Sequence, residues 1–184
     1  AQKFGLNQNY ELCYICRTKI TYAHDFYKNM CNLCGIINKN KRDMMCDLKD
    51  KIAIVTGGRV KIGFETALRL LRCGCHVIIT TRFSKDALER YTKEKDYEIW
   101  IDNLKIFEAD FLSFDDTKIF IEYIFKNYTK IDFLINNAAQ TISRPSEFYN
   151  HLLLANPDVK LIEKHIVNND CIIGIENNDK YNNK

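Results

Sequence analysis

The sequence predicts an α/β protein with a doubly wound parallel sheet, preceded by a small cysteine-rich module. From Asp47 onward, continuous apolar runs alternate with amphipathic stretches, as in buried parallel strands covered by helices on both faces. Hydrophobic residues make up 46% of the 184 residues, which is enough to fill a core. Four of the eight cysteines form two Cys-x-x-Cys pairs near the N-terminus, a spacing typical of metal sites.

The first elements of the α/β region surround a glycine-rich turn. Residues 51–55 (KIAIV) have the pattern of a buried strand. Residues 62–74 place apolar side chains at helical spacing and end on Gly74, a typical helix stop. Residues 76–80 (HVIIT) predict a second strand, so the region begins with a βαβ unit.

Four further elements continue the alternation. Residues 84–104 begin with a serine that we expect to cap a helix. Residues 113–128 begin with another serine followed by acids, which suit the positive end of a helix dipole. Residues 105–111 and 131–136 predict the third and fourth strands. With right-handed crossovers, this order gives an incomplete Rossmann-like fold.

The pattern weakens on either side of this region. Residues 38–43 (NKNKRD) are predicted to be a polar linker, and one helix is expected within residues 158–167. The Asn/Lys-rich tail at 175–184 is expected to be disordered or an insert. We therefore divide the chain into a cysteine module and linker (1–46), a Rossmann-like dinucleotide-binding half-domain (47–140) and a partial substrate-side segment with the tail (141–184).

Charge and hydropathy argue against several classes of partner. The net charge is +3, with +4 in residues 1–46 and −1 in the remainder, a small excess that fits a solvated face better than nucleic-acid binding. No apolar run approaches the roughly 20 residues that span a bilayer. Without a signal peptide, a cytoplasmic protein with no membrane partner is expected. The chain begins without Met, so organelle targeting stays open.

The two Cys-x-x-Cys pairs predict a structural zinc site. The pairs are separated by 14 residues, and two such knuckles supply the four thiolates that tetrahedral zinc prefers. Two alternatives stay open: His24 replacing one thiolate, and a pair of redox dithiols. We expect the module to dock a protein partner. The predicted zinc ligands are Cys13, Cys16, Cys31 and Cys34, and the predicted small core consists of Tyr14, Tyr22, Phe26 and Tyr27.

The turn between the first strand and helix is typical of a phosphate site. Backbone N–H groups at such a helix start point toward a pyrophosphate, and the helix dipole favours its charge. Glycines serve where the backbone turns sharply or touches the ligand. Gly57, Gly58 and Gly63 lie in this context.

With these residues the sequence resembles the short-chain dehydrogenase/reductase family over residues 50–140. That family's turn is Thr-Gly-x-x-x-Gly-x-Gly, and this chain reads Thr56-Gly57-Gly58-Arg59-Val60-Lys61-Ile62-Gly63. Ala109-Asp110-Phe111 ends the third strand, where the family has an Asp beside the adenine. Asn136-Asn137-Ala138-Ala139 ends the fourth strand and is similar to the family's Asn-Asn-Ala-Gly.

The resemblance implies a dinucleotide site and leaves one departure to explain. Lys61 replaces the middle glycine, where its side chain would either crowd the pyrophosphate or place an ammonium beside it. The alternative is a nucleotide fold that has lost its ligand. The implied cofactor-binding residues are Thr56, Gly57, Gly58, Arg59, Lys61, Ile62, Gly63, Arg82, Asp110, Phe111, Asn136, Asn137, Ala138 and Ala139.

The end of the second strand favours NADP(H) over NAD(H). An acid there would bind the ribose 2′-hydroxyl of NAD, whereas an arginine suits the 2′-phosphate of NADP. This chain has Arg82 there and no acid before Asp86, and Arg59 in the turn is expected to approach the same phosphate. The alternative is that both are surface arginines.

The proton-transfer residues implied by the resemblance are not found in this sequence. The family uses a Ser and a Tyr-x-x-x-Lys pair, and no such set follows Asn137. Tyr91 and Lys95 have this spacing but are interpreted as part of an exposed charged helix. No catalytic residue is therefore named, and we expect the chain to be interrupted before that set.

Two functions are consistent with these observations. The first is an NADP(H)-dependent oxidoreductase that transfers hydride between nicotinamide and a small carbonyl or alcohol substrate. The alternative is a non-catalytic zinc-plus-dinucleotide module that acts as a sensor or scaffold. In either case half a sheet would expose apolar surface, so a partner, a second copy or the missing half is expected to cover it.

Overall fold

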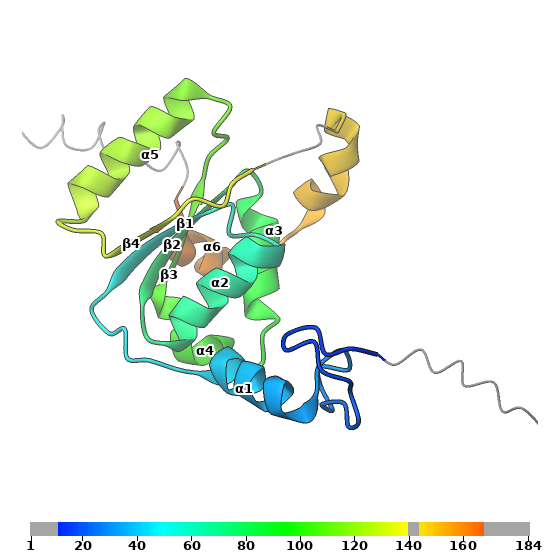
Figure 1. Cartoon of the computed structure of the whole chain (residues 1–184). Coiled ribbons are helices and arrows are strands. Elements are labelled where there is room, and N and C mark those ends of the chain that lie inside the picture. The colour runs from blue at the N-terminus through cyan, green and yellow to red at the C-terminus, as the bar shows by residue number, and fades with distance from the viewer. Residues whose placement is uncertain (1–10, 140–143, 168–184) are drawn as a thin grey trace, which may run out of the picture. The chain divides into compact units, whose positions relative to one another are not determined.

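The chain divides into two compact units, residues 1–46 and 47–184. The structure, a computed structural model, describes residues 11–139 and 144–167 (Figure 1). The predicted tail at 175–184 lies outside the described residues. None of the described helices combines the length and apolar character needed to cross a membrane.

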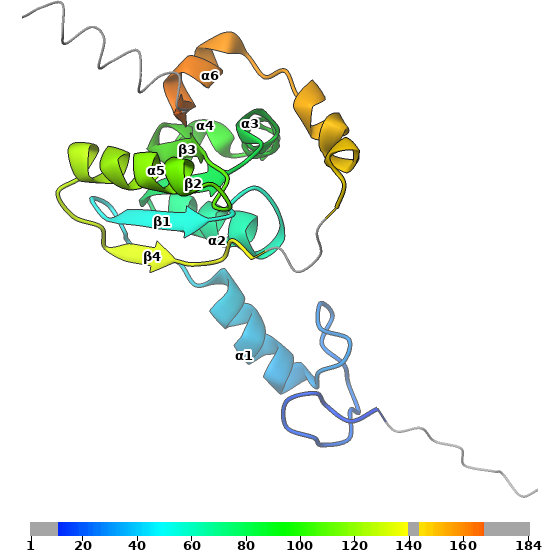
Figure 2. The same ribbon diagram turned by 90° about the horizontal axis from the view of Figure 1, so that it is seen from above.

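A five-stranded parallel sheet forms the centre of the second unit. Its order is β4-β1-β2-β3-β5. The chain runs outward from β1 through β2 to β3, returns to the other side of β1 as β4, and then crosses the sheet to pair β5 with β3. Strand β4 lies beside β1 and points the same way (Figure 2). This sheet confirms the predicted doubly wound α/β fold. The strands are β1 (Ile52–Thr56), β2 (His76–Thr81), β3 (Leu104–Glu108), β4 (Phe133–Ile135) and β5 (Ile166–Val167).

Helices cover both faces of the sheet because successive strand residues point to opposite sides. Ala53 and Val55 of β1 belong to the cluster packed against α2 and α3, whereas Ile54 belongs to the cluster packed against α5. Figure 1 shows α5 on the opposite face of the sheet from α2. The helices of this unit are α2 (Lys61–Arg72), α3 (Ser84–Thr92), α4 (Tyr97–Trp100), η1 (Ile101–Asn103), α5 (Phe114–Asn127), η2 (Ser146–Leu154) and α6 (Val159–His165).

The prediction of one continuous helix at 84–104 is wrong. It is divided into α3, α4 and η1, with a turn at residues 93–96. Arg72 of α2 binds Asp96 through two nitrogens at 2.7 Å each and Glu94 at 3.0 Å, so a tertiary ion pair holds the turn. This contact overrides the helical propensity of a Lys/Glu-rich sequence.

The two serine caps have different outcomes. Ser113 caps α5 as predicted, because its hydroxyl oxygen accepts a hydrogen bond from Asp116 N at 3.2 Å. Ser84 is not a cap: it is the first residue of α3, it is buried, and its hydroxyl contacts Glu108 of β3. The helix expected within 158–167 is α6, and the short β5 that follows it was not predicted.

The first unit is small, and its described part, residues 11–46, buries few apolar side chains. Its helix α1 (Asn32–Asp43) begins at the second cysteine pair and runs through residues 38–43, so the predicted polar linker is helical instead. An ion pair between Lys39 and Asp43 at 2.6 Å joins successive turns of this segment.

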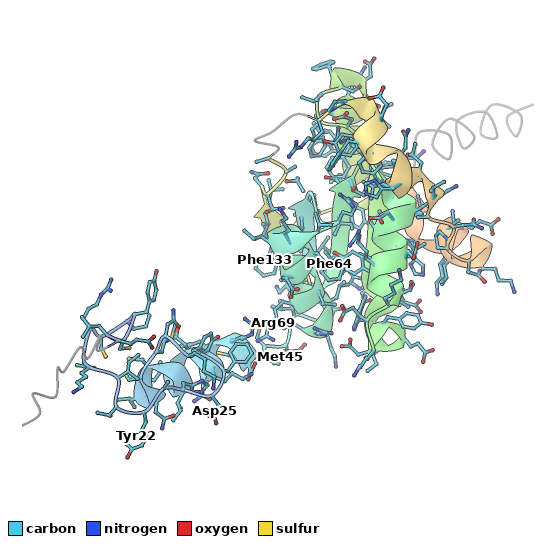
Figure 3. All side chains as sticks on the ribbon, turned by 90° about the vertical axis from the view of Figure 1, so that its right-hand side faces the viewer. Tyr22, Asp25, Met45, Phe64, Arg69 and Phe133 are labelled. Carbon is cyan, nitrogen blue, oxygen red and sulfur yellow. The ribbon has the colours of Figure 1, made fainter. Side chains whose placement is uncertain are left out.

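The aromatic core predicted for this unit is wrong for three of its four residues, whereas Tyr27 is half-buried and packs against His24 and Phe26. Tyr14, Tyr22 and Phe26 are 61%, 81% and 54% exposed, whereas Cys13 and Met30 are buried. Tyr22 points away from the other side chains of the unit (Figure 3). A segment of this size encloses little volume, so its interior is filled by sulfur-bearing side chains instead of rings.

Candidate functional site

The turn between β1 and α2 needs glycine for steric reasons. Gly57 has φ +67°, and a Cβ there would lie 3.0 Å from the Cα of Ala138. A Cβ on Gly63 would lie 2.5 Å from Asn137 Nδ2. Two glycines of the predicted motif therefore let the turn and β4's end approach each other closely.

Thr56 and Asn137 lock this arrangement from the ends of two neighbouring strands. Thr56 Oγ1 accepts hydrogen bonds from Asn137 N at 2.8 Å and from Ala138 N at 2.9 Å. The Asn137 amide donates to the carbonyls of Thr56 at 3.1 Å and Gly57 at 3.2 Å. These two predicted residues therefore act mainly on the shape of the turn.

Tyr91 supports the same turn through a buried hydrogen bond. The sequence analysis did not identify it as a site residue. Its ring is fully buried, and its hydroxyl donates to the carbonyl of Gly58 at 2.8 Å. Burial raises the pKa of Tyr91, so the hydroxyl remains a donor. The interpretation of both residues as part of an exposed helix is therefore wrong: Tyr91 lies in α3 but is buried, and Lys95 is exposed but lies in the turn at 93–96.

The first amides of the turn are used within the protein. Gly58 N donates to Thr80 O at 3.2 Å, and Gly57 N contacts Thr80 Oγ1 at 3.4 Å. These contacts join the turn to β2. The amides at the start of α2 have no carbonyl four residues earlier in the helix, which makes them the natural donors to an anion.

Lys61 has a backbone conformation that favours glycine. Its φ is +54°, in the left-handed region that costs a side-chain-bearing residue roughly 1–2 kcal/mol. Its ammonium makes no ion pair within the described residues. The side chain lines the cavity described next, so the departure from glycine adds a positive charge to the site.

A cavity of about 860 Å³ opens at the carboxyl ends of the strands. Ten of the fourteen predicted cofactor residues line it; Thr56, Gly58, Gly63 and Asn136 do not. Its lining carries four cations and, among the described residues, one carboxylate, that of Asp110. The cations are Arg59, Lys61, Arg82 and Arg144.

The cavity also has lining residues that sequence reasoning missed. Phe83 and Leu112 directly follow predicted site segments, so their position offered a weak signal. Arg144 and Tyr149 lie beyond β4, where the strand–helix pattern fades, and no local motif marked them.

Both arginines predicted for the 2′-phosphate have carboxylate neighbours. Arg59 Nη1 lies 2.7 Å from Asp86 Oδ2, which also accepts from Arg90 Nε at 2.7 Å. Burial opposes ionisation of Asp86, but the two guanidinium groups hold its pKa below the ordinary value. Arg82 lies 3.7 Å from Asp110, beyond hydrogen-bonding distance, so this pair is looser.

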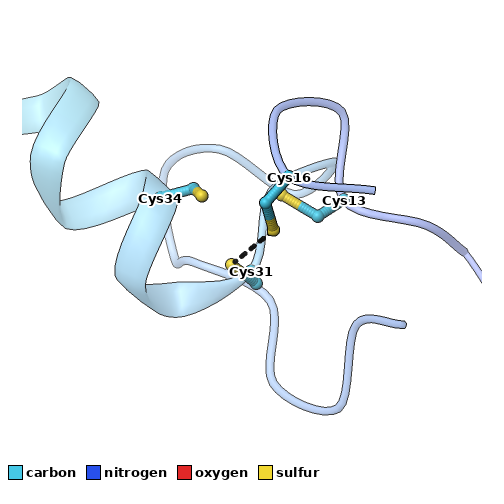
Figure 4. A group of neighbouring side chains, drawn as sticks. All are labelled: Cys13, Cys16, Cys31 and Cys34. Carbon is cyan, nitrogen blue, oxygen red and sulfur yellow. Dashed lines mark hydrogen bonds between the residues drawn. The ribbon is translucent and has the colours of Figure 1, made fainter. Parts of the chain in front are cut away.

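The four predicted cysteine ligands meet in the first unit. Their sulfur atoms all lie within 4.8 Å of one another, and the side chains of Cys13, Cys16, Cys31 and Cys34 converge (Figure 4). The Cys16 and Cys31 sulfurs are 3.8 Å apart. Zinc–sulfur bonds of about 2.3 Å give a tetrahedron with edges of about 3.8 Å, so the cluster fits zinc.

His24 does not join this cluster. Its Nδ1 accepts hydrogen bonds from the backbone N–H groups of Phe26 and Tyr27, both at 3.1 Å. A Cβ on Gly35 would collide with the His24 ring, which shows how closely the ring packs on the start of α1. The alternative of a histidine ligand through Nδ1 is therefore wrong.

The thiols of the cluster differ in acidity. Burial raises the pKa of Cys13, but backbone N–H groups of Cys16 and Cys31 outweigh it and lower the value to about 6. The neighbouring Cys31 sulfur, together with burial, raises the pKa of Cys34 to about 12. Sulfurs at this distance oppose one another's ionisation, and a bound cation relieves such repulsion.

The family model described as short chain dehydrogenase matches residues 51–153. An uncharacterized protein of Acanthamoeba polyphaga mimivirus is 41% identical over 136 residues, which cover 71% of this chain and 29% of that protein. A dehydrogenase/reductase SDR family protein 7-like of Dictyostelium discoideum is 34% identical over 93 residues, covering 49% and 29%.

A solved structure, the Pseudomonas aeruginosa RhlG/NADP active-site complex, aligns with a TM-score of 0.44 and 24% identity, covering 69% of this chain and 47% of that chain. The chain thus spans about 29% of the length of the two curated relatives named. The family model covers more than half of the chain, including the glycine turn, both asparagines and the cavity lining. The chain belongs to the short-chain dehydrogenase family.

Proposed function

We propose that this chain is the cofactor-binding part of an NADP(H)-dependent oxidoreductase. The observation that carries the proposal is the cavity beside the glycine turn, where four cations face one carboxylate among the described lining residues. A ligand with several phosphates matches this charge, and the amides at the start of α2 add donors for a pyrophosphate.

The choice of NADP(H) over NAD(H) rests on Arg59 and Arg82. Both guanidinium groups lie near Phe83, directly after β2, with Cζ 5.4 Å from its ring centre. Guanidinium binds phosphate with planar, paired donors. Within the described residues, no acid at the end of β2 lines the cavity to bind a ribose 2′-hydroxyl.

The predicted residues at the ends of β3 and β4 have distinct roles in this proposal. Asp110 and Phe111 border the adenine, and Asn137 to Ala139 line the side of the ribose and nicotinamide. Asp110 is held for this role because its N–H donates to Asp116 at 2.8 Å and its carboxylate accepts from Leu112 N at 3.0 Å. Bound NADP(H) would supply hydride for a small carbonyl or alcohol substrate.

Titration with NADPH, followed by its fluorescence, tests the proposal. We expect micromolar binding and at least a tenfold weaker complex for Arg82→Ala, because removing a charge-assisted phosphate contact costs about 1.5–3 kcal/mol. Arg69→Ala, a cation of α2 that does not line the cavity, is the matched control and should bind as the parent does. Equal NADPH affinity in the Arg82→Ala variant and the parent would remove the basis for NADP(H).

A zinc ion in the cysteine cluster is the second part of the proposal. The four sulfurs have the chemistry and spacing of a closed tetrahedral site, which leaves no position for a substrate, so the role is structural. The expected content is one zinc per chain by elemental analysis, lost in Cys31→Ser. Cys46→Ser is the control, because Cys46 is exposed and outside the cluster. Purified chain without zinc, or with zinc retained by Cys31→Ser, would refute this assignment.

A non-catalytic binding module remains the second candidate function. One observation favours it: within residues 138–184 no Tyr-x-x-x-Lys pair occurs, and Tyr149 is followed four residues later by Leu153. Proton transfer requires a positioned acid or base, which a cofactor alone does not supply. Oxidation of NADPH by the chain with a panel of small aldehydes and ketones supports the enzyme, whereas binding without turnover supports the module.

A further inference from the structure

One wall of the cavity is formed by two aromatic rings from distant parts of the sequence. Phe83 follows β2, and Tyr149 lies in η2. Their ring centres are 5.5 Å apart and their planes are inclined by 27°, so the rings are stacked. Both residues line the cavity, and Tyr149 also lines a neighbouring cavity of about 730 Å³.

Arg82 lies against both rings. Its Cζ is 5.0 Å from the centre of Tyr149 and 5.4 Å from the centre of Phe83. Both distances lie within the range in which an aromatic face attracts a cation. Arg59 contacts only the Phe83 ring among this pair, also at 5.4 Å.

The two arginines are therefore oriented by different means. A short ion pair of 2.7 Å with Asp86 fixes Arg59, whereas the pair between Arg82 and Asp110 is 3.7 Å long. The Arg82 guanidinium, unlike that of Arg59, also lies against the faces of both rings. Arginine side chains lose considerable rotamer entropy on binding, so ordering one before the ligand arrives strengthens binding.

From this arrangement we infer that Tyr149 is a specificity-determining positioning residue. With Phe83 it holds the Arg82 guanidinium in place for the 2′-phosphate that distinguishes NADP(H) from NAD(H). This assignment rests on the proposed NADP(H) function. The ring carries the effect, because the cation lies against the aromatic face, so phenylalanine should replace tyrosine at this position.

The test compares NADPH with NADH in the full chain. In Tyr149→Ala we expect the Kd for NADPH to rise about fivefold to tenfold and the Kd for NADH to change less than twofold. Tyr149→Phe should retain the preference of the parent. Leu153→Ala is the matched control, because Leu153 belongs to the same short helix, is 69% exposed and does not line the cavity.

Two further variants keep the test decisive. Tyr149→Leu removes the π-face while keeping bulk, so it should lose the preference even if Tyr149→Ala unfolds; cooperative thermal unfolding identifies the folded variants. Equal weakening of NADPH and NADH binding in Tyr149→Leu would show a merely structural role and overturn the inference.

The same measurements separate this inference from the proposal beneath it. A parent chain that binds neither cofactor overturns both. If Arg82→Ala loses the preference for NADPH while Tyr149→Ala and Tyr149→Leu keep it, NADP(H) binding stands and the role of Tyr149 is refuted.

Discussion

The two units of this chain enclose their interiors with different chemistry. In the α/β unit, side chains of three central strands alternate between two apolar clusters, and Val55, Ile79 and Phe107 are fully buried. Among residues 11–46 of the cysteine unit the buried side chains are Cys13 and Met30, while the tyrosines are exposed or half-buried. An apolar core therefore stabilises the α/β unit, whereas the cysteine unit has little apolar core and, under our proposal, depends on its zinc site for stability.

The same contrast appears in how each unit positions its functional groups. The cysteine unit gathers four identical ligands from two short knuckles, and local spacing accounts for most of that geometry. The α/β unit assembles its cavity from the ends of separate strands and from η2. Function in this unit consequently depends on long-range packing as well as on motif.

The largest expected effect is that of removing zinc. Structural zinc binding contributes about 10–16 kcal/mol in small domains, so a chelator should unfold residues 11–46. Hydrogen exchange should show loss of amide protection there and unchanged protection in the strands β1 to β3. Protection that persists in residues 11–46 after complete zinc removal would show that this unit has another source of stability.

Removing a large side chain from the apolar core should destabilise the α/β unit and leave the cysteine unit unchanged. The ring centre of Phe107 lies 4.9 Å from that of Phe120 and 5.2 Å from that of Tyr123. Phe107→Ala should lower the free energy of unfolding of the α/β unit by about 3–5 kcal/mol. The measurement is urea unfolding, with zinc content expected to stay constant. Phe125→Ala is the control, because Phe125 is 81% exposed on the same helix as Phe120. Similar losses for both phenylalanines would contradict the assigned core.

A smaller effect is expected beneath the glycine turn. Tyr91→Phe removes the donor to Gly58 O and leaves a buried carbonyl unpaired, which should cost about 1–3 kcal/mol in unfolding free energy. Tyr22→Phe makes the same chemical change on the exposed surface of the cysteine unit, and it should be within about 0.5 kcal/mol of the parent. Thermal or urea unfolding of the two variants side by side gives the difference.

The smallest effect concerns pH and His165, whose Nδ1 lies 3.2 Å from Leu104 O on β3. Burial, reinforced by Lys105 and Lys164, lowers the pKa of His165 below 6.5 despite this contact and the opposing charge of Asp102. The unfolded chain therefore binds a proton at a higher pH than the folded chain does. Stability is complete above about pH 6.5 and decreases below it, by at most about 1.4 kcal/mol per pH unit.

Urea unfolding between pH 7 and 5 measures this slope. His165→Gln should flatten it, whereas His76→Gln, at an exposed position, should leave it unchanged. An unchanged slope in His165→Gln would mean that the pH dependence originates in other groups.

Sequence patterns went further for the fold than for the cavity. Alternating apolar runs identified the four main strands, and the motif residues located ten members of the cavity lining. The division of the chain at 46 and 140 and the roles of the site residues remain predictions. The patterns failed at residues 84–104 and 38–43, where contacts of Arg72 and the start of α1 decided the local structure.

Periodicity and residue spacing were sufficient to predict the parallel sheet, the glycine turn and the four-cysteine cluster. Three contacts became apparent only in the folded chain: Tyr91 with Gly58, Asp86 with Arg59, and Tyr149 stacked on Phe83 beside Arg82. Those contacts join segments that are remote along the chain. Their partners are set by how helices and strands pack, which local periodicity does not specify.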